Sequence, residues 1–339
     1  MRLRALLLVS CLAASRLVSA ADAEVKLEGY AEWRNGPVLL VDGQRVEAAP
    51  GMKFKGQAPA KDFGTIPLGY EVKVKGTRRP DGVVVAKEVE AKPNGSAMFE
   101  REVLSATDEL EASWVKAGKV FEPLANGSEE VIGRLHSTGP DVDRVRTIVG
   151  RVTPPHRDPA QFRVYVVDNA EWNAFACANG MIVVHSQLLA DMNDDDLGII
   201  MGHELVHVTH EHTRRQFKSA MWIQLVGLGV LAGSQAIDDK KARAIVDLAA
   251  VFSLMAWKNG YSREHEDQAD RVGIRYAHEG GYDVRRGPDL WMRFAKKYGD
   301  QNRAVNFFFG DHSVSAARAK NIQREIALNY SAPAVRPAP

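Results

Sequence analysis

Hydrophobic and charged residues alternate along the first quarter of the chain, from about residue 25 to residue 92. In Gly69–Lys75, for example, apolar side chains alternate with glutamate and lysine, and Asp42-Gly43 is one of several turn signals between such segments. A period of two predicts strands that bury one face. We therefore expect residues 25–92 to form a small all-β module, an antiparallel barrel or a sandwich, that packs on the next domain or binds a ligand or envelope component.

After a linker at residues 93–97, the spacing of apolar residues becomes mainly helical. The predicted helices cover residues 98–116, 142–152 and the apolar run from Leu197 to His212, and the predicted strands cover residues 162–168 and 173–184. Asn179-Gly180 provides a tight turn within the second strand segment, which makes it a β pair. The predicted fold class is α+β, in which the all-β module precedes a mainly helical domain over residues 98–330 with a small sheet.

Two further apolar stretches, Met221–Ala232 and Ala244–Trp257, also have helical spacing. The first is too short to cross a bilayer. We expect a buried or partly exposed helical hairpin, with contact to a membrane surface or a partner protein as the alternative.

The charge balance restricts the partners. The 339 residues include 44 basic and 43 acidic side chains, which gives a formal net charge of +1 with histidine neutral. Such a balance provides neither the basic footprint of a nucleic-acid-binding protein nor a polybasic membrane patch. We therefore expect no nucleic-acid partner, and the function must be found in a local site.

A secretory signal is predicted at residues 1–20. Two arginines precede an apolar run over residues 5–14, and small residues lead to a cleavage site after Ala20 or Ala21. We expect an exported protein that is periplasmic or secreted. In an alternative interpretation, Cys11 is the lipidated residue of a lipoprotein signal, and its lipid would attach the protein to a membrane.

The central motif is His203-Glu204-Leu205-Val206-His207, of the form HExxH. Residues four apart lie on one face of a helix, so His203 and His207 can present two imidazoles to one metal ion. Two neutral imidazoles with a vacant position suit zinc. Glu204 is then placed to reach a metal-bound water rather than the metal. Because only three positions are fixed and chance matches occur, the motif needs a third ligand.

Two acidic residues downstream can supply that third ligand, and spacing alone does not choose between Glu264 and Glu266. On a helix, Glu266 shares a face with Asp270, so one can bind metal while the other holds the outer nitrogen of a histidine ligand. Glu264 has Gln268 in that place, which is a poorer orienting partner. His210, three residues after the motif, either competes as a ligand or is solvated or hydrogen-bonded.

Taken in order, these motifs resemble the HtpX-like zinc endopeptidases, a family that includes the CAAX prenyl proteases and periplasmic quality-control proteases. The resemblance covers about residues 144–322, and its matched segments are Asn173-Ala174-Phe175-Ala176, His203–His207, His212, Ser262-Arg263 with Glu266 and Asp270, Gly281-Tyr282-Asp283, and His312 with Arg318. Gly202 replaces the family's usual alanine, and Ser313 replaces a proline. Spanning helices of the family are not evident, so the resemblance implies a soluble, exported member.

The resemblance implies a zincin-type domain of the gluzincin class, mainly helical with a small sheet at the cleft. One zinc ion per chain would be held by His203, His207 and Glu266, with Asp270 behind a histidine. The implied function is zinc-dependent endopeptidase activity on protein or peptide substrates, unfolded or envelope proteins in quality control. An extended substrate would bind along the edge strand Asn173, Ala174, Phe175 and Ala176.

Two residues near the C-terminus carry further expectations. His312 would donate a hydrogen bond to the carbonyl oxygen in the transition state, with Arg318 nearby or holding a carboxylate. Alternatively, His312 is a fourth zinc ligand in a resting state, or an ordinary surface histidine. The competing function is a periplasmic chaperone or binding protein with a structural or latent zinc site. Glu204 argues against that alternative, because a structural site does not need a general base.

Overall fold

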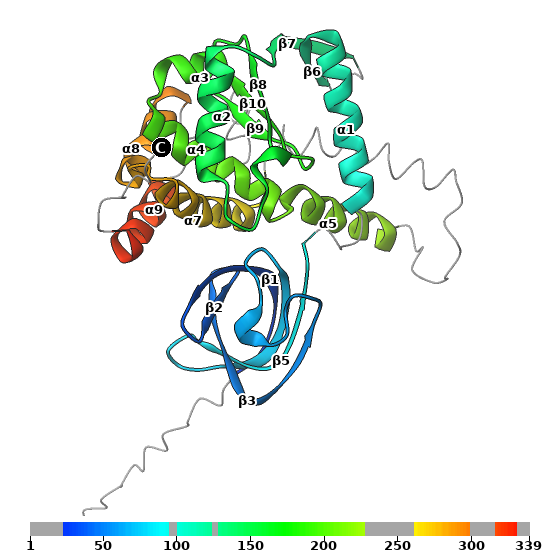
Figure 1. Cartoon of the computed structure of the whole chain (residues 1–339), viewed down its shortest axis with the longest axis vertical. Coiled ribbons are helices and arrows are strands. Elements are labelled where there is room, and N and C mark those ends of the chain that lie inside the picture. Colours follow the sequence, from blue (N-terminus) through cyan, green and yellow to red (C-terminus); the bar gives the residue numbers. More distant parts are fainter. Residues whose placement is uncertain (1–22, 95–99, 124–127, 228–260, 299–315, 331–339) are drawn as a thin grey trace, which may run out of the picture.

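The computed structural model describes residues 23–94, 100–123, 128–227, 261–298 and 316–330 (Figure 1). Several expectations lie outside these ranges: the signal at residues 1–20 with Cys11, most of the linker, the segment from residue 228 to residue 257, and His312 with Ser313.

The N-terminal residues form a closed barrel with the strand order β1-β2-β3-β5-β4. Its strands are β1 (Ala23–Asn35), β2 (Val38–Val41), β3 (Gln44–Gly56), β4 (Glu71–Arg78) and β5 (Val84–Lys92). Alternate apolar side chains such as Leu39, Val74 and Val89 are fully buried inside it. The predicted all-β module is confirmed, and of its two predicted forms it is the barrel. The expectation of an antiparallel arrangement was wrong at one seam, where β3 and β5 pair in parallel. A closed ring with an odd number of strands cannot alternate direction throughout, so one neighbouring pair must be parallel.

The second sheet has the strand order β6-β7-β8-β10-β9. Its strands are β6 (Lys119–Pro123), β7 (Glu129–His136), β8 (Arg163–Val167), β9 (Ala174–Ala176) and β10 (Met181–His185). Strands β8 and β10 are parallel, and β9 pairs antiparallel with β10 at one edge of the sheet. The predicted strands correspond to β8 and the β9–β10 pair, whereas the β6–β7 hairpin was not predicted.

Helices pack around this sheet (Figure 1). Their bounds are α1 (Glu100–Ala117), α2 (Pro140–Val152), α3 (Ser186–Asp191), α4 (Asp194–Thr209), α5 (His212–Gly227), α7 (Arg263–Glu279), α8 (Gly287–Tyr298) and α9 (Ala316–Asn329). The α+β fold class is confirmed. Among the described helices, none combines the length and the hydrophobicity that a membrane span needs.

Helix α4 carries the HExxH motif and is buried along almost its entire length. Its first turn is capped by Asn193, whose side chain accepts a hydrogen bond from the backbone N–H of Asp196. The apolar run does not continue as one helix to His212. The helix ends at Thr209, and the chain turns at Glu211, which has a φ of 51°, before α5 begins. This turn sends His212 back toward the motif.

The barrel lies at one end of the molecule and contacts the helical part through β1, which faces α5 and α7 (Figure 1). Arg275 of α7 donates to the backbone carbonyl of Glu32 at 2.8 Å and lies over the ring of Trp33. At a second point, a Cβ on Gly69 would come within 2.6 Å of the His156 ring, and Gly69 has a φ of +84°. Only glycine suits this position, because the close approach and the positive φ both exclude a side chain.

Candidate metal centre

Three buried side chains from two helices meet at one point. His203 and His207 come from α4 and Glu266 from α7, and one ligand atom of each lies within 4.8 Å of the others. The Nε2 atoms of the histidines are 3.1 Å apart, and the Glu266 oxygens lie 3.4 Å from His203 Nε2 and 3.6 Å from His207 Nε2. Glu264, the other carboxylate that spacing allowed, is exposed.

The donor set fits a tetrahedral metal ion. With metal–ligand bonds of about 2.0–2.1 Å, two ligands of a tetrahedral zinc site lie about 3.3 Å apart, and the separations of 3.1, 3.4 and 3.6 Å are close to this value. Two imidazole nitrogens and one carboxylate are also ligands that zinc commonly takes. The group formed by His203, His207 and Glu266 can therefore bind a metal.

The outer nitrogen of His203 is held by a carboxylate. Asp270 lies with Oδ1 3.0 Å from Nδ1 of His203, and Arg318 donates two hydrogen bonds to Asp270, at 2.7 and 2.6 Å. Arg318 also lies 3.3 Å from Glu266. Burial alone would lower the pKa of His203, but Asp270 and Glu266 outweigh it and raise the pKa to about 9. Without a metal, a proton on His203 neutralises the carboxylates, and a bound cation would displace it.

The outer nitrogen of His207 has a different partner. Its Nδ1 lies 2.9 Å from Nδ1 of His212, and the Nε2 of His212 lies 2.9 Å from Oε1 of Gln268. Burial lowers the pKa of His212 well below its usual value, so this imidazole is neutral. Sequence reasoning noted His212 only as a family match and Gln268 only as a poorer orienting partner for Glu264. The only sequence signal for Gln268 was its polar side chain on the same helix face as Glu264.

Glu204 lies beside the three ligands and next to the edge strand. Its carboxylate accepts a hydrogen bond from the backbone N–H of Ala176 in β9. Burial raises the pKa of the Glu204 carboxyl to about 8, and Glu266 adds to this rise while His203 opposes it. The Glu204 carboxyl therefore lies next to both the metal group and the backbone of β9.

The four residues expected along a substrate come together at β9. Asn173 precedes the strand, and Ala174, Phe175 and Ala176 form it. All four are buried. Neither polar atom of the Asn173 side chain has a hydrogen-bond partner among the described residues. A buried amide without such a partner is costly unless a ligand or another group satisfies it.

Two aromatic residues that sequence reasoning missed pack on the ligands. The Tyr261 ring stacks on His207 with centroids 4.0 Å apart, and its hydroxyl lies 2.8 Å from Thr213 Oγ1. Trp291 of α8 meets His203 edge to face at 5.8 Å. Isolated aromatic residues far along the chain give no sequence signal for such contacts, because only the fold brings them together.

The remaining candidate site residues, His210, Arg318 and His312, differ in where they lie. His210 is buried beside Tyr30, and its Nδ1 lies 3.0 Å from Thr209 Oγ1, so it is hydrogen-bonded away from the metal group. Arg318 holds a carboxylate, which was one of its two expected positions. His312 lies outside the described residues.

Comparison with known proteins places this site in a family. The model of peptidase family M48 matches residues 134–326. The beta-barrel assembly-enhancing protease of Escherichia coli K12 is 31% identical over 153 residues, which cover 42% of this chain and 29% of that protein. The mitochondrial metalloendopeptidase OMA1 of Bos taurus is 27% identical over 168 residues, 48% of this chain and 32% of that protein.

A shorter relative, the metalloprotease YcaL of Escherichia coli K12, is 27% identical over 169 residues, 50% of this chain and 63% of that protein. The chain thus spans less than a third of the first two relatives and less than two thirds of YcaL. The resemblance seen in the sequence motifs is confirmed, because the family model covers more than half of the chain, including both metal-binding segments. The protein belongs to peptidase family M48.

Proposed function

We propose that this protein is a zinc-dependent endopeptidase that hydrolyses peptide bonds within protein substrates. The convergence of His203, His207 and Glu266, with Glu204 beside them, carries the proposal. Membership of a peptidase family supports it. We assign one zinc ion per chain to the three ligands, and we assign the catalytic domain to residues 98–330 and the N-terminal module to residues 25–92.

Zinc bound to these ligands would act as a Lewis acid that polarises the scissile carbonyl and makes water easier to deprotonate. Glu204 accepts the proton of the attacking water and returns it to the leaving amine. Asp270 keeps the His203 ring oriented, because its carboxylate lies 3.0 Å from the outer nitrogen. Arg318 holds Asp270 and contacts Glu266, so its role is to position these carboxylates.

We place the substrate along β9, which is the outer strand of its sheet. An extended peptide can pair with such an edge through its backbone, whatever its sequence. Glu204 accepts a hydrogen bond from Ala176 of this strand, so a peptide on β9 passes the general base. The amide of Asn173 would satisfy its hydrogen-bonding groups on the peptide backbone. His312 remains our candidate for a donor to the carbonyl oxygen.

The proposed substrates are unfolded or envelope proteins. Pairing by strand addition favours extended chains over folded ones. Relatives named beta-barrel assembly-enhancing protease support an envelope setting, as does the signal predicted at residues 1–20. We propose an exported protein, with membrane attachment through Cys11, the barrel or residues 221–257 as the less favoured form.

A protease assay with defined metal content tests this function. We expect purified protein to contain one zinc per chain and to cleave casein, to lose cleavage with a chelator, and to regain it when zinc is restored. Zinc-loaded, folded protein that cleaves no unfolded substrate would contradict the proposal. If zinc removal then unfolded the protein, the competing function, a binding protein with structural zinc, would be supported.

A further inference from the structure

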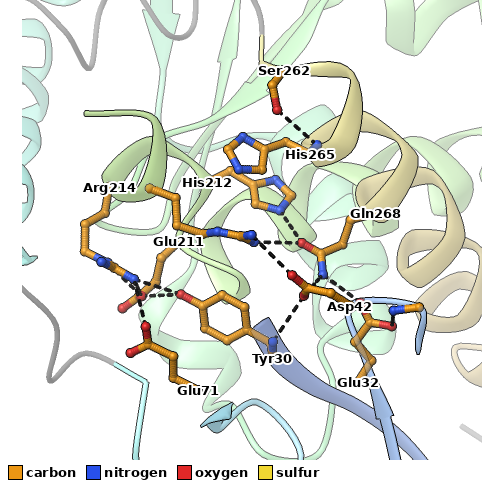
Figure 2. Close-up of polar contacts among 12 residues, drawn as sticks. Tyr30, Glu32, Asp42, Glu71, Glu211, His212, Arg214, Ser262, His265 and Gln268 are labelled. Atoms are coloured by element: carbon orange, nitrogen blue, oxygen red, sulfur yellow. Dashed lines mark hydrogen bonds and ion pairs between the residues drawn. The ribbon is translucent and has the colours of Figure 1, made fainter. Parts of the chain in front are cut away.

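A chain of hydrogen bonds joins one metal ligand to the N-terminal barrel. From His207 it passes to His212 and then to Gln268, over two distances of 2.9 Å. The Nε2 of Gln268 donates to Glu32 Oε1 and to Asp42 Oδ1, both at 2.6 Å. Figure 2 shows Gln268 between His212 on one side and the two barrel carboxylates on the other.

The barrel end of this chain of hydrogen bonds fixes which partner donates and which accepts at each step. Glu32 is ion-paired with Arg271, and an ionised carboxylate only accepts hydrogen bonds, so Glu32 requires the NH2 group of Gln268 to face it. Asp42, which pairs with Arg215, accepts from the same NH2 group. The carbonyl Oε1 of Gln268 must then face the other way, where Arg215 donates to it at 3.0 Å. A flipped amide would place its oxygen against two carboxylates and its NH2 against a guanidinium, so the orientation is held from both sides.

The same order of donors and acceptors extends to His207, the metal ligand. Because Oε1 of Gln268 accepts, the Nε2 of His212 carries its proton, and its Nδ1 offers a lone pair to the Nδ1 of His207 at 2.9 Å. His207 therefore donates from Nδ1 and keeps a lone pair on Nε2, the atom that faces His203 and Glu266. A metal-binding imidazole needs this tautomer.

We infer that the N-terminal barrel sets the tautomer of His207 through Gln268 and His212, so the metal site has its full affinity only when the barrel is docked. Gln268 and His212 are thus positioning residues. The inference rests on the metal site proposed above. His203 has no such dependence, because its outer nitrogen is held by Asp270 from α7. The two histidine ligands are therefore oriented from different parts of the chain.

The test substitutes residues of the barrel or Gln268 and measures the tautomer of His207 and the zinc affinity. In the double variant Glu32→Gln with Asp42→Asn, the barrel no longer requires the NH2 group of Gln268 to face it, because the new amides can donate or accept. Only Arg215 then still holds the amide, which can turn more easily. Gln268→Met removes the link at nearly constant volume. The control is Tyr30→Phe, which removes barrel contacts to Glu211 and Arg214 but leaves Gln268 untouched.

Two measurements on the full-length protein test this inference. Nitrogen-15 NMR of the imidazoles in metal-free protein reports which ring nitrogen carries the proton, and competition with a chelator gives zinc affinity. We expect wild type and Tyr30→Phe to hold His207 as the Nδ1–H tautomer with equal zinc affinity. The double variant and Gln268→Met should show mixed tautomers and bind zinc about 10- to 100-fold more weakly.

Unchanged tautomer and affinity in both variants would overturn the inference, as would an equal loss in Tyr30→Phe, which would indicate general loosening of the interface. If a variant does not fold, the wild-type spectrum still decides, because a proton on Nδ1 of His212 contradicts the direction. Failure of wild type to bind zinc would instead refute the proposed function. The two failures are therefore distinguishable.

Discussion

Gly202 of α4 and Gly273 of α7 lie where the two helices cross at very short range. A Cβ on Gly202 would come within 2.5 Å of the carbonyl oxygen of Gly273, and a Cβ on Gly273 would come within 2.7 Å of the His203 backbone. Neither position has room for a methyl group. This close crossing brings Glu266 of α7 up to the histidines of α4, so the metal group depends on two glycines.

An alanine at this crossing should damage both stability and metal binding. We expect Gly273→Ala to push α7 away from α4, which lowers the free energy of unfolding by about 1–3 kcal/mol and weakens zinc binding. The matched control is Gly150→Ala in α2, where a Cβ meets nothing within 4 Å. That change should stabilise by about 0.5–1 kcal/mol. Denaturant titration and chelator competition measure both effects. Unaltered zinc affinity in Gly273→Ala would refute the dependence.

Arg318→Lys separates a positioning role from a catalytic one. Lysine keeps the charge but cannot form the two parallel bonds that Arg318 makes to Asp270. We expect zinc affinity to fall about 10-fold, as for other partners of metal ligands, and saturating zinc to restore most of kcat. A variant with normal zinc affinity and a low kcat would indicate that Arg318 acts on the transition state.

The sequence predicted the parts of this protein that depend on local pattern. Alternation identified the barrel strands, and helical spacing identified α1, α2 and α4. The HExxH spacing placed two histidines on one face, and the face shared by Glu266 and Asp270 indicated which carboxylate joins them. These are properties of single strands or helices, for which periodicity is sufficient.

Relationships between distant segments could not be predicted in this way. The parallel β3–β5 seam follows from closure of the barrel, and Gly202 gains its meaning only when Gly273 lies against it. The link from Gln268 to Glu32 joins residues 236 positions apart. No local sequence pattern predicts such a contact, because the two residues meet only after the barrel has docked.

Asn173→Ala tests the proposed substrate strand. The Asn173 side chain makes no hydrogen bond among the described residues, so its loss should change the free energy of unfolding little. If it binds the peptide backbone, KM for casein should rise about 10-fold, with zinc affinity unchanged. Steady-state kinetics and a melting curve suffice. Destabilisation with unaltered KM would mean that the amide serves the fold.

Glu100 should make stability depend on pH. Burial raises the pKa of its carboxyl to about 8, and its hydrogen bond with Glu211 adds to the rise. The folded protein therefore retains a proton that the unfolded chain releases above pH about 4.5. Stability from this group is complete below pH about 4.5 and is lost as the pH rises toward about 8.

Glu100→Gln stays neutral and should remove this loss, so its free energy of unfolding relative to wild type should improve between pH 5 and pH 8.5. Denaturant curves at both values, with chelator present to fix the metal state, measure the change. Glu109→Gln, an exposed change on the same helix, is the control for charge removal. An equal pH response in both variants would refute the role of the buried carboxyl.

The central claim is that Glu204 is the general base of a zinc peptidase, and Glu204→Gln tests it most directly. Glutamine keeps the size of the side chain but cannot accept the proton of the attacking water. The account predicts one zinc per chain in this variant, a normal melting temperature and a rate of casein cleavage lower by about 100- to 10,000-fold. Normal turnover by zinc-loaded Glu204→Gln protein would contradict it.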